Sequence, residues 1–361
     1  EITTRLVGSE MCIRDRNKSH GERSYKMGEI KLQINPKNRP AVPAVNWQQA
    51  RVLEMQEEYA AAFDTSLVNT IEEMRAAYNE ERKMWNTGGP VMAETVDFDV
   101  PYEGDKVPVR LLRPVKAEKL PVIFFMHGGG FVEGNNDTHS MAQRKLAAYS
   151  GCVVIGIDYS LAPEIKYPRA IKECVAVCHY VSEHADEYGI DSEKIGFAGD
   201  SGGANMAMGV CMCLRDEGFD VSKIKGNILY YGGYGLMSSI SSYQHGGKWD
   251  GMSEADLSSP SCYIAPDVNR FDCPYFHIYA NDLTHDVPPC FLVAAELDPL
   301  RDDSKLLYEI LTNNGIQAEY HEYKGALHAF IHYSKVMDDA EDALRRGAHF
   351  FAHNCGLDPR N

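Results

Sequence analysis

The chain has no run of about 18 consecutive apolar residues, which is the length a helix needs to cross a bilayer. Its first residues also lack the apolar core of a secretory signal. Positive charge is scarce: 36 Lys and Arg face 52 Asp and Glu, which leaves a formal net charge of −16. We therefore expect neither a nucleic-acid nor a membrane partner, because the phosphate groups of both attract basic surfaces.

A disulfide framework and a metal-binding pattern are missing as well. The ten cysteines are scattered through the chain, and the closest pairs, Cys174 with Cys178 and Cys211 with Cys213, lack C-x-x-C spacing. We expect buried thiols in a reducing, cytoplasmic compartment.

Two histidine pairs are spaced four residues apart, His328 with His332 and His349 with His353. Neither pair has a further ligand at suitable spacing. We interpret His332, His349 and His353 as packing or surface residues, and we expect no metal and no cofactor.

The first 26 residues fit no folded element. Leu6 to Arg16, LVGSEMCIRDR, resembles translated sequencing-adaptor or linker sequence. We expect residues 1–26 to lie outside the fold, as a non-native or disordered segment, and Met27 to be the natural start.

The next part of the chain has a helical pattern. Apolar residues recur at helical spacing over Trp47 to Phe63 and Leu67 to Asn86. Asp64 or Thr65, which lie between the two segments, can cap the second helix.

From residue 94 onward, strand patterns and helix patterns alternate. Such alternation predicts an α/β fold, a mostly parallel sheet with helices on both faces. The expected helices are 141–149, 168–188, 204–217 and 303–313. The expected strands are 94–100, 107–112, 122–126, 152–157, 195–198, 228–231, 291–295 and 319–323. Residues 234–287 break this rhythm and indicate an insertion.

Lys194 to Cys211, KIGFAGDSGGANMAMGVC, predicts a strand, a sharp turn and a helix. Ser201 lies at the centre of G-x-S-x-G, the pattern of a nucleophile elbow, in which a tight turn exposes the serine oxygen above a sheet. The motif alone is ambiguous, because GDSGG also surrounds the nucleophile of trypsin-like proteases.

A serine nucleophile needs a base, an acid that orients the base, and donors for the oxyanion. Asp298 and His328 each follow a predicted core strand and are the acid and base candidates. The order serine, acid, histidine is that of α/β-hydrolases and not of trypsin-like proteases. Asp302 is the alternative acid, and Asp200 is expected to make a structural hydrogen bond.

The oxyanion donors are expected from two glycine-containing stretches. The loop His127-Gly-Gly-Gly-Phe131 follows the strand 122–126, and its glycines let backbone N–H groups approach a substrate oxygen. The predicted oxyanion-hole residues are Gly128, Gly129, Gly130 and, after the nucleophile, Gly202.

Five motifs in order, HGGGF, DYSLAPE, GDSGG, ELDPLRDD and GALHAF, resemble the hormone-sensitive-lipase-like branch of bacterial α/β-hydrolase esterases. Within that branch the chain is most similar to the acetyl esterases, through stretches such as GGYGL at 232–236 and KWDG at 248–251. The resemblance implies an eight-stranded sheet and hydrolysis of short-chain acyl esters. It also implies N-terminal lid helices within 27–90, and a hydrolase domain over 91–361 that carries a lid insertion at about 234–287.

Carried over to these motifs, the resemblance assigns Ser201 as nucleophile, Asp298 as acid, His328 as base and the HGGG glycines to the oxyanion hole. Gly202 departs from the branch, which commonly has Ala there. The expected partner is a small-molecule ester, acetylated sugars among the candidates, and the protein is expected to be a monomer or a homodimer. Three rivals stay open: an amidase or formamidase, a long-chain lipase, and a binding protein on the same scaffold.

Overall fold

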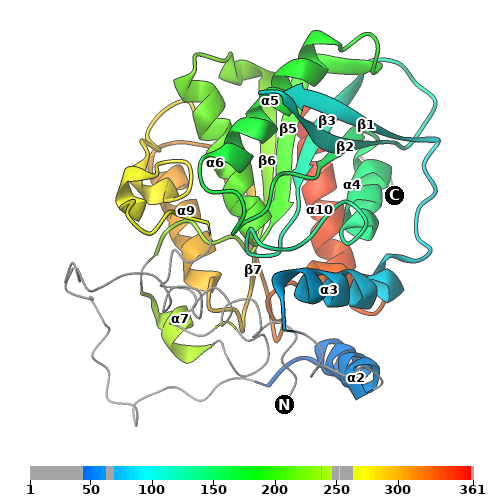
Figure 1. Cartoon of the computed structure of the whole chain (residues 1–361), viewed down its shortest axis with the longest axis vertical. Coiled ribbons are helices and arrows are strands. Elements are labelled where there is room, and N and C mark those ends of the chain that lie inside the picture. Colours follow the sequence, from blue (N-terminus) through cyan, green and yellow to red (C-terminus); the bar gives the residue numbers. More distant parts are fainter. Residues whose placement is uncertain (1–43, 62–68, 237, 246–251, 253–262, 359–361) are drawn as a thin grey trace.

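The protein is built around one eight-stranded sheet (Figure 1). The computed structural model describes residues 44–61, 69–236, 238–245, 252 and 263–358. Strand order is β1-β2-β4-β3-β5-β6-β7-β8; β2 runs antiparallel to both neighbours, and the pairs from β4 to β8 are parallel. The strands are β1 (Glu94–Tyr102), β2 (Asp105–Arg113), β3 (Leu120–Met126), β4 (Val153–Ile157), β5 (Ile190–Asp200), β6 (Ile224–Tyr230), β7 (Cys290–Ala295) and β8 (Ala318–Tyr323). The predicted α/β class is confirmed.

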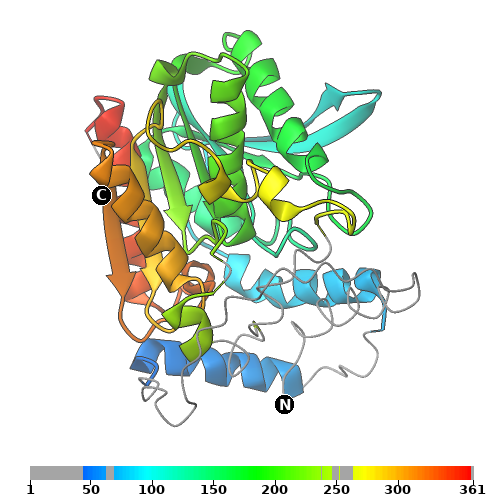
Figure 2. The same ribbon diagram turned by 90° about the vertical axis from the view of Figure 1, so that its left-hand side faces the viewer.

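Helices cover both faces of the sheet, and the residues of β3 show why. Side chains alternate along a strand, so Val122 and Phe124 pack into one buried cluster while Ile123 and Phe125 pack into the other. The first cluster lies under α5 (Arg169–Glu183), α6 (Gly202–Asp216) and α9 (Arg301–Asn313). The second lies under α4 (Ser140–Ser150) and α10 (Asp338–Asn354), as Figures 1 and 2 show from two sides.

Two N-terminal helices, α2 (Trp47–Ala61) and α3 (Ile71–Asn86), lie together beyond one end of the sheet (Figure 2). Val52 of α2 and Trp85 of α3 are buried in the cluster shared with α4 and α10. Helix α3 thus packs on the sheet domain through Trp85, whereas α2 packs there through Val52 and the polar Gln48 and Gln49.

The start of α3 corrects the sequence interpretation. Helix α3 begins at Ile71 rather than Leu67, because Thr70 accepts from the Glu73 N–H while the Glu73 carboxylate accepts from the Thr70 N–H. This capping box satisfies two backbone donors at the helix start. The predicted caps, Asp64 and Thr65, lie outside the described residues.

Helix α10 was not predicted, although it covers much of one face of the sheet. Within the predicted insertion the structure describes one short helix, α7 (Ile240–Gln244), and two 3-10 turns, η4 (Arg270–Asp272) and η5 (Ile278–Ala280). Part of the insertion, including residues 248–251, lies outside the described residues, as do residues 1–26. No helix in the described ranges combines the length and apolarity needed to cross a bilayer.

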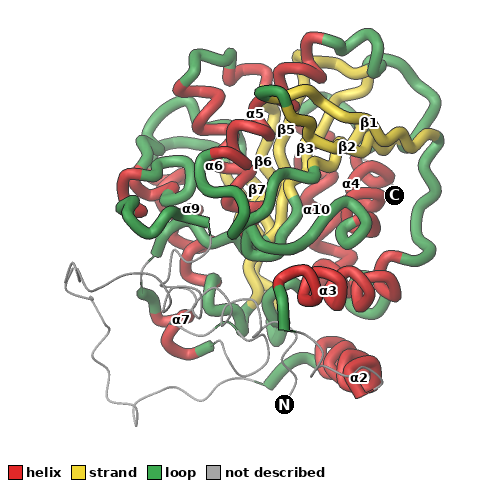
Figure 3. The backbone as a smooth tube through the Cα atoms, viewed as in Figure 1, coloured by secondary structure: helices red, strands yellow, loops and turns green. Residues whose placement is uncertain are grey.

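The tube view shows how loops gather at the end of the sheet nearest α3 (Figure 3). Described cysteines are all buried free thiols, as predicted. Burial raises the pKa of the Cys178 thiol to about 12, so that it stays protonated at neutral pH.

Candidate active site

Ser201 lies in the sharp turn between β5 and α6. Its φ of 54° and ψ of −120° are rare for a residue with a side chain. Hydrogen bonds hold the turn: the Ser201 N–H donates to the Tyr230 carbonyl at 2.9 Å, and the Ser201 carbonyl accepts from the Ala204 N–H at 3.1 Å. The predicted strand-turn-helix arrangement is therefore present.

Two glycines next to Ser201 are required by close packing. A Cβ atom on Gly199 would lie 2.3 Å from the Gly203 carbonyl oxygen, and one on Gly203 would lie 2.1 Å from the Met126 carbonyl oxygen. Gly202 is different, since its Cβ would meet its nearest neighbour, Phe131 Cζ, at an ordinary 3.4 Å.

The structure brings Ser201, His328 and Asp298 together in one line of hydrogen bonds. His328 Nε2 lies 2.8 Å from Ser201 Oγ, and His328 Nδ1 lies 2.7 Å from Asp298 Oδ2. Asp298 is fully buried and His328 almost so, while Ser201 is partly exposed. This arrangement can draw the hydroxyl proton onto the imidazole, which the carboxylate keeps oriented.

The acid and the base of this line are each held by a further contact. Asp298 Oδ1 accepts from the Leu300 N–H at 2.7 Å, and the edge of the Tyr231 ring packs against His328 with centroids 4.9 Å apart. The alternative acid, Asp302, turns toward α7 instead, because its Oδ2 accepts from the Ser241 N–H at 2.8 Å.

The third carboxylate of this segment, Asp303, also has a structural task. Its Oδ1 accepts from the N–H groups of Tyr234, Gly235 and Leu236. Burial raises the pKa of Asp303 to about 7. Asp303 thus anchors the loop after β6 and does not contact His328.

The glycine loop divides into two parts. The Gly128 N–H donates to Asp200 Oδ1 at 3.0 Å and also lies 3.2 Å from His139 Nε2. It is therefore engaged inside the protein, and the prediction of Gly128 as an oxyanion donor is wrong. The expected structural hydrogen bond of Asp200 is confirmed by this contact.

Gly129 and Gly130 differ from Gly128. Both have positive φ, 113° and 59°, and among the described residues their N–H groups take no part in the hydrogen bonds that hold the loop. The loop is closed by the Gly129 carbonyl, which accepts from the N–H groups of Val132 and Glu133. Gly130 N lies 3.5 Å from the place of a Cβ on Gly202, so Gly130 is next to the turn of Ser201.

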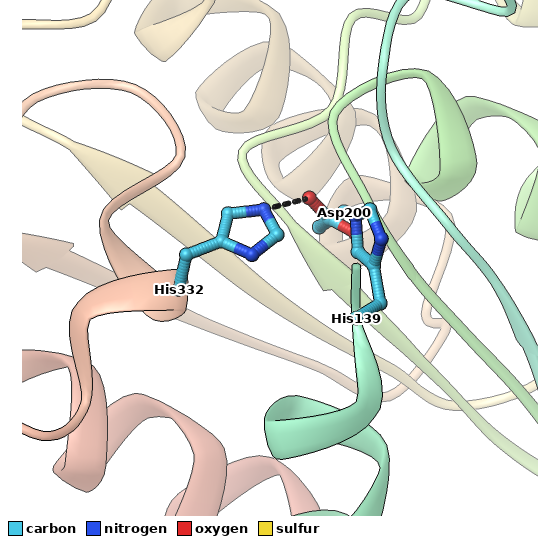
Figure 4. A group of neighbouring side chains, drawn as sticks. All are labelled: His139, Asp200 and His332. Atoms are coloured by element: carbon cyan, nitrogen blue, oxygen red, sulfur yellow. Dashed lines mark ion pairs between the residues drawn. The ribbon is translucent and has the colours of Figure 1, made fainter. Parts of the chain in front are cut away.

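His139, Asp200 and His332 form a buried cluster (Figure 4), and Asp200 directly precedes Ser201 in the chain. Asp200 Oδ1 lies 3.3 Å from His139 Nε2, and Asp200 Oδ2 lies 3.4 Å from His332 Nε2. Burial, followed by the positive charge of Arg82, lowers the pKa of His332 to about 3. The ring is therefore neutral at pH 7.

These three side chains are, among the described residues, a group whose ligand atoms are close enough to share a metal ion. The contacts of Gly128 argue against that use. Its N–H is directed at His139 Nε2 and Asp200 Oδ1 together, where a shared cation would have to bind. We interpret the cluster as a hydrogen-bonding group.

Sequence reasoning missed most of this cluster. His332 was interpreted as a packing or surface residue, and its spacing of four from His328 was the available signal. His139 stands in no motif, so its place became visible only in the fold.

The N-terminal helices contact the loops of the site directly. From α3, Arg75 donates to the carbonyls of Val132 and Ala162 and to both carboxylate oxygens of Glu164, at 2.7 to 3.0 Å. From α2, Gln49 Oε1 accepts from the Leu327 N–H at 3.1 Å. These contacts connect both helices to the segments that carry Gly129 and His328.

Comparison with known proteins gives a consistent picture. A family profile described as an alpha/beta hydrolase fold matches residues 123–332, more than half of the chain. The Pyrobaculum calidifontis esterase in its monoclinic form is 30% identical, with 84% of this chain and 97% of that chain covered and a TM-score of 0.74.

Two structures from environmental DNA are also similar. EstE1, a thermostable carboxylesterase from a metagenomic library, is 29% identical over 79% of this chain and 97% of that chain, with a TM-score of 0.74. The ester-hydrolase EH1AB1 from the Lake Arreo metagenome is 26% identical over 87% of this chain and all of that chain, with a TM-score of 0.79.

Proposed function

This chain is an esterase of the alpha/beta hydrolase fold family, and we propose that it hydrolyses short-chain acyl esters, acetyl esters above all, through Ser201, His328 and Asp298. The observation that carries the proposal is the unbroken line of hydrogen bonds from Ser201 Oγ through His328 to the buried Asp298. A binding protein has no need of such an arrangement.

The reaction begins with attack of Ser201 Oγ on the ester carbonyl carbon. His328 Nε2 takes the hydroxyl proton as the bond forms, and the negative charge of Asp298 stabilises the resulting imidazolium. His328 then gives that proton to the alcohol oxygen, and the alcohol leaves. Water attacks the acyl-enzyme by the same route and releases the carboxylic acid.

The charge that develops on the carbonyl oxygen is stabilised by backbone N–H groups. We assign Gly129, Gly130 and Gly202 as the donors, because Gly202 begins α6, Gly130 borders Gly202 and Gly129 directly precedes Gly130. The first N–H groups of a helix have no partner within it, so the Gly202 N–H is free to point at a substrate. Loss of one such donor costs about 10²-fold or more in turnover.

The acyl preference rests on the motifs shared with acetyl esterases, and we extend it to acetylated sugars as a substrate class. Hydrolysis rates for p-nitrophenyl acetate, butyrate and octanoate test the acyl preference. Acetate release from an acetylated oligosaccharide tests the alcohol side. A parallel panel of amides distinguishes an amidase, and octanoate as the best substrate would identify a lipase.

Ser201→Ala tests the nucleophile. We expect p-nitrophenyl acetate hydrolysis to fall by at least about 10³-fold, because the residue that forms the acyl-enzyme is lost. Circular dichroism and thermal unfolding should match those of the unaltered protein. Near-normal turnover in a folded variant would show that the assignment is wrong.

A further inference from the structure

We propose that Asp200 is a positioning residue, whose carboxylate aligns the oxyanion loop and the catalytic-histidine segment on either side of the nucleophile. Asp200 is the last residue of β5 and directly precedes Ser201. It is about 1% exposed, so its charge must be satisfied by protein groups rather than by water. The inference rests on the proposed esterase activity of the same site.

The first contact fixes the oxyanion loop. Asp200 Oδ1 accepts from the Gly128 N–H at 3.0 Å, and the next two residues are the proposed oxyanion donors Gly129 and Gly130. The approach is close: a Cβ on Gly128 would lie 2.6 Å from Asp200 Oδ2. A shift of this loop by a few tenths of an ångström would therefore move both donors relative to Ser201.

The second contact fixes the segment of the catalytic histidine. His332 belongs to the 3-10 turn η6 (Phe330–Tyr333), which follows His328 after a single residue in a left-handed conformation, Ala329. His332 Nε2 lies 3.4 Å from Asp200 Oδ2. Because the His332 ring is neutral, its Nε2–H can donate to this oxygen without adding a buried positive charge.

His139 completes the set from the start of α4. Its Nε2 lies 3.3 Å from Asp200 Oδ1, and its Nδ1 lies 2.9 Å from Thr138 Oγ1, which keeps the ring in one orientation. Burial alone would raise the pKa of Asp200, but the charge and hydrogen bonding of His139, with the hydrogen bond of His332, hold it well below its ordinary value. The segments of Gly128, His139 and His332 thus converge on the Asp200 carboxylate (Figure 4), which also accepts from the Tyr231 hydroxyl at 3.5 Å.

Positioning has a specific kinetic consequence. A loop that holds the oxyanion donors matters in the transition state and much less in the ground state, so its loss lowers kcat rather than raising KM. A role confined to folding would instead lower the unfolding temperature and leave the turnover of the folded molecules unchanged.

The test is Asp200→Asn, assayed with p-nitrophenyl acetate and with a trifluoromethyl ketone, which forms a tetrahedral adduct with the serine. We expect kcat to fall at least about tenfold, KM to change by less than about threefold, and ketone affinity to fall in step with kcat. Glu173→Gln is the matched control. Glu173 is an equally buried carboxylate that accepts from a backbone N–H, that of Ser160, at 2.8 Å. We expect the Glu173→Gln variant to be less stable than the unaltered protein but to keep the same kcat and ketone affinity.

A second pair of variants keeps the proposal testable if Asp200→Asn does not fold. His332→Leu removes the imidazole donor to Asp200 Oδ2, whereas His332→Gln keeps a donor at a similar reach. We expect His332→Leu to have a kcat at least about fivefold below that of His332→Gln. Equal values, or a folded Asp200→Asn protein with unchanged kcat and ketone affinity, would overturn the proposal. Ser201→Ala decides separately whether the esterase function itself is correct.

Discussion

Ser201 combines a strained backbone with a precise side-chain contact. A non-glycine residue at positive φ costs about 1–3 kcal/mol, and such conformations persist where the surrounding structure enforces them. Here the enforcing contacts are the close approaches of Gly199 to Gly203 and of Gly203 to Met126. What the strain achieves is the projection of Ser201 Oγ to within 2.8 Å of His328 Nε2.

Substitutions of Gly202 and Gly203 distinguish a steric requirement at this turn from the requirement for a backbone N–H donor. We expect Gly202→Ala to keep activity within about threefold, because its Cβ would meet Phe131 at an ordinary distance of 3.4 Å and the backbone N–H remains. Gly203→Ala is the matched comparison. Its Cβ would lie 2.1 Å from the Met126 carbonyl oxygen, so we expect a clear loss of stability.

Thermal unfolding and p-nitrophenyl acetate turnover of the two variants measure the difference. Gly202→Pro adds a check on the donor, since proline is accepted at the first position of a helix but has no N–H. A fully active Gly202→Pro enzyme would mean that the oxyanion hole is wrongly placed.

At the scale of elements, α3 acts as a support for the glycine loop. The Arg75 guanidinium connects Val132, which follows the loop, with Ala162 and Glu164 in the segment after β4. These two segments are themselves joined, because the Ala162 N–H donates to the Phe131 carbonyl at 2.8 Å. Helix α3 therefore holds the segment after the glycine loop through Arg75, while Asp200 holds the start of the loop at Gly128.

Arg75→Ala should make the glycine loop and the segment after β4 less rigidly held. We expect a loss of about 1–3 kcal/mol in unfolding free energy and a lower kcat, because two carbonyls and a carboxylate lose their donor together. Denaturant unfolding and esterase assays measure both effects. Arg51→Ala is the control on α2, where a half-exposed ion pair with Glu54 should contribute little. Equal behaviour of the two variants would contradict the role given to Arg75.

The whole molecule carries a formal net charge of −16 around a buried core shared by two helical layers. The net charge plays no part in the making of the acyl bond. That step depends on the Asp298 carboxylate and the His328 imidazole, which interact at hydrogen-bond distance. The net charge acts instead at long range, on the approach of charged molecules through solvent.

An anionic ester should therefore be disfavoured at low salt. We expect kcat/KM for p-nitrophenyl hemisuccinate to rise about threefold or more as NaCl increases from about 10 mM to about 300 mM, because salt screens the repulsion. Neutral p-nitrophenyl butyrate is the control and should change little. A salt response shared by both esters would show that the effect is not electrostatic repulsion.

Local pattern was enough for much of the fold and of the site. Strands β3, β4 and β7 are continuous apolar runs, so their buried central positions followed from composition. Ser201, Asp298 and His328 each follow a strand, and the carboxyl ends of parallel strands meet at one edge of a sheet. Chain order then distinguished this arrangement from the protease alternative.

Other features depended on where separate segments meet. Only the fold showed that the Gly128 N–H points at Asp200 and not at a substrate, because a backbone direction is not encoded in residue type. Only the fold likewise showed why Asp298 rather than Asp302 is the acid, because Asp302 accepts a hydrogen bond from Ser241 of α7. His139 had no local signal at all.

The sequence by itself determined the strand and helix periods, the turn that needs small residues and the chemical groups available for acyl transfer, since each depends on neighbours along the chain. Tertiary structure decided which of those groups face one another. His139, Asp200 and His332 are far apart in the sequence, and their convergence depends on the packing of β5, α4 and η6. Long-range contacts of this kind follow from the fold as a whole. A buried charge needs polar partners, and the packing of distant segments decides which partners lie beside it.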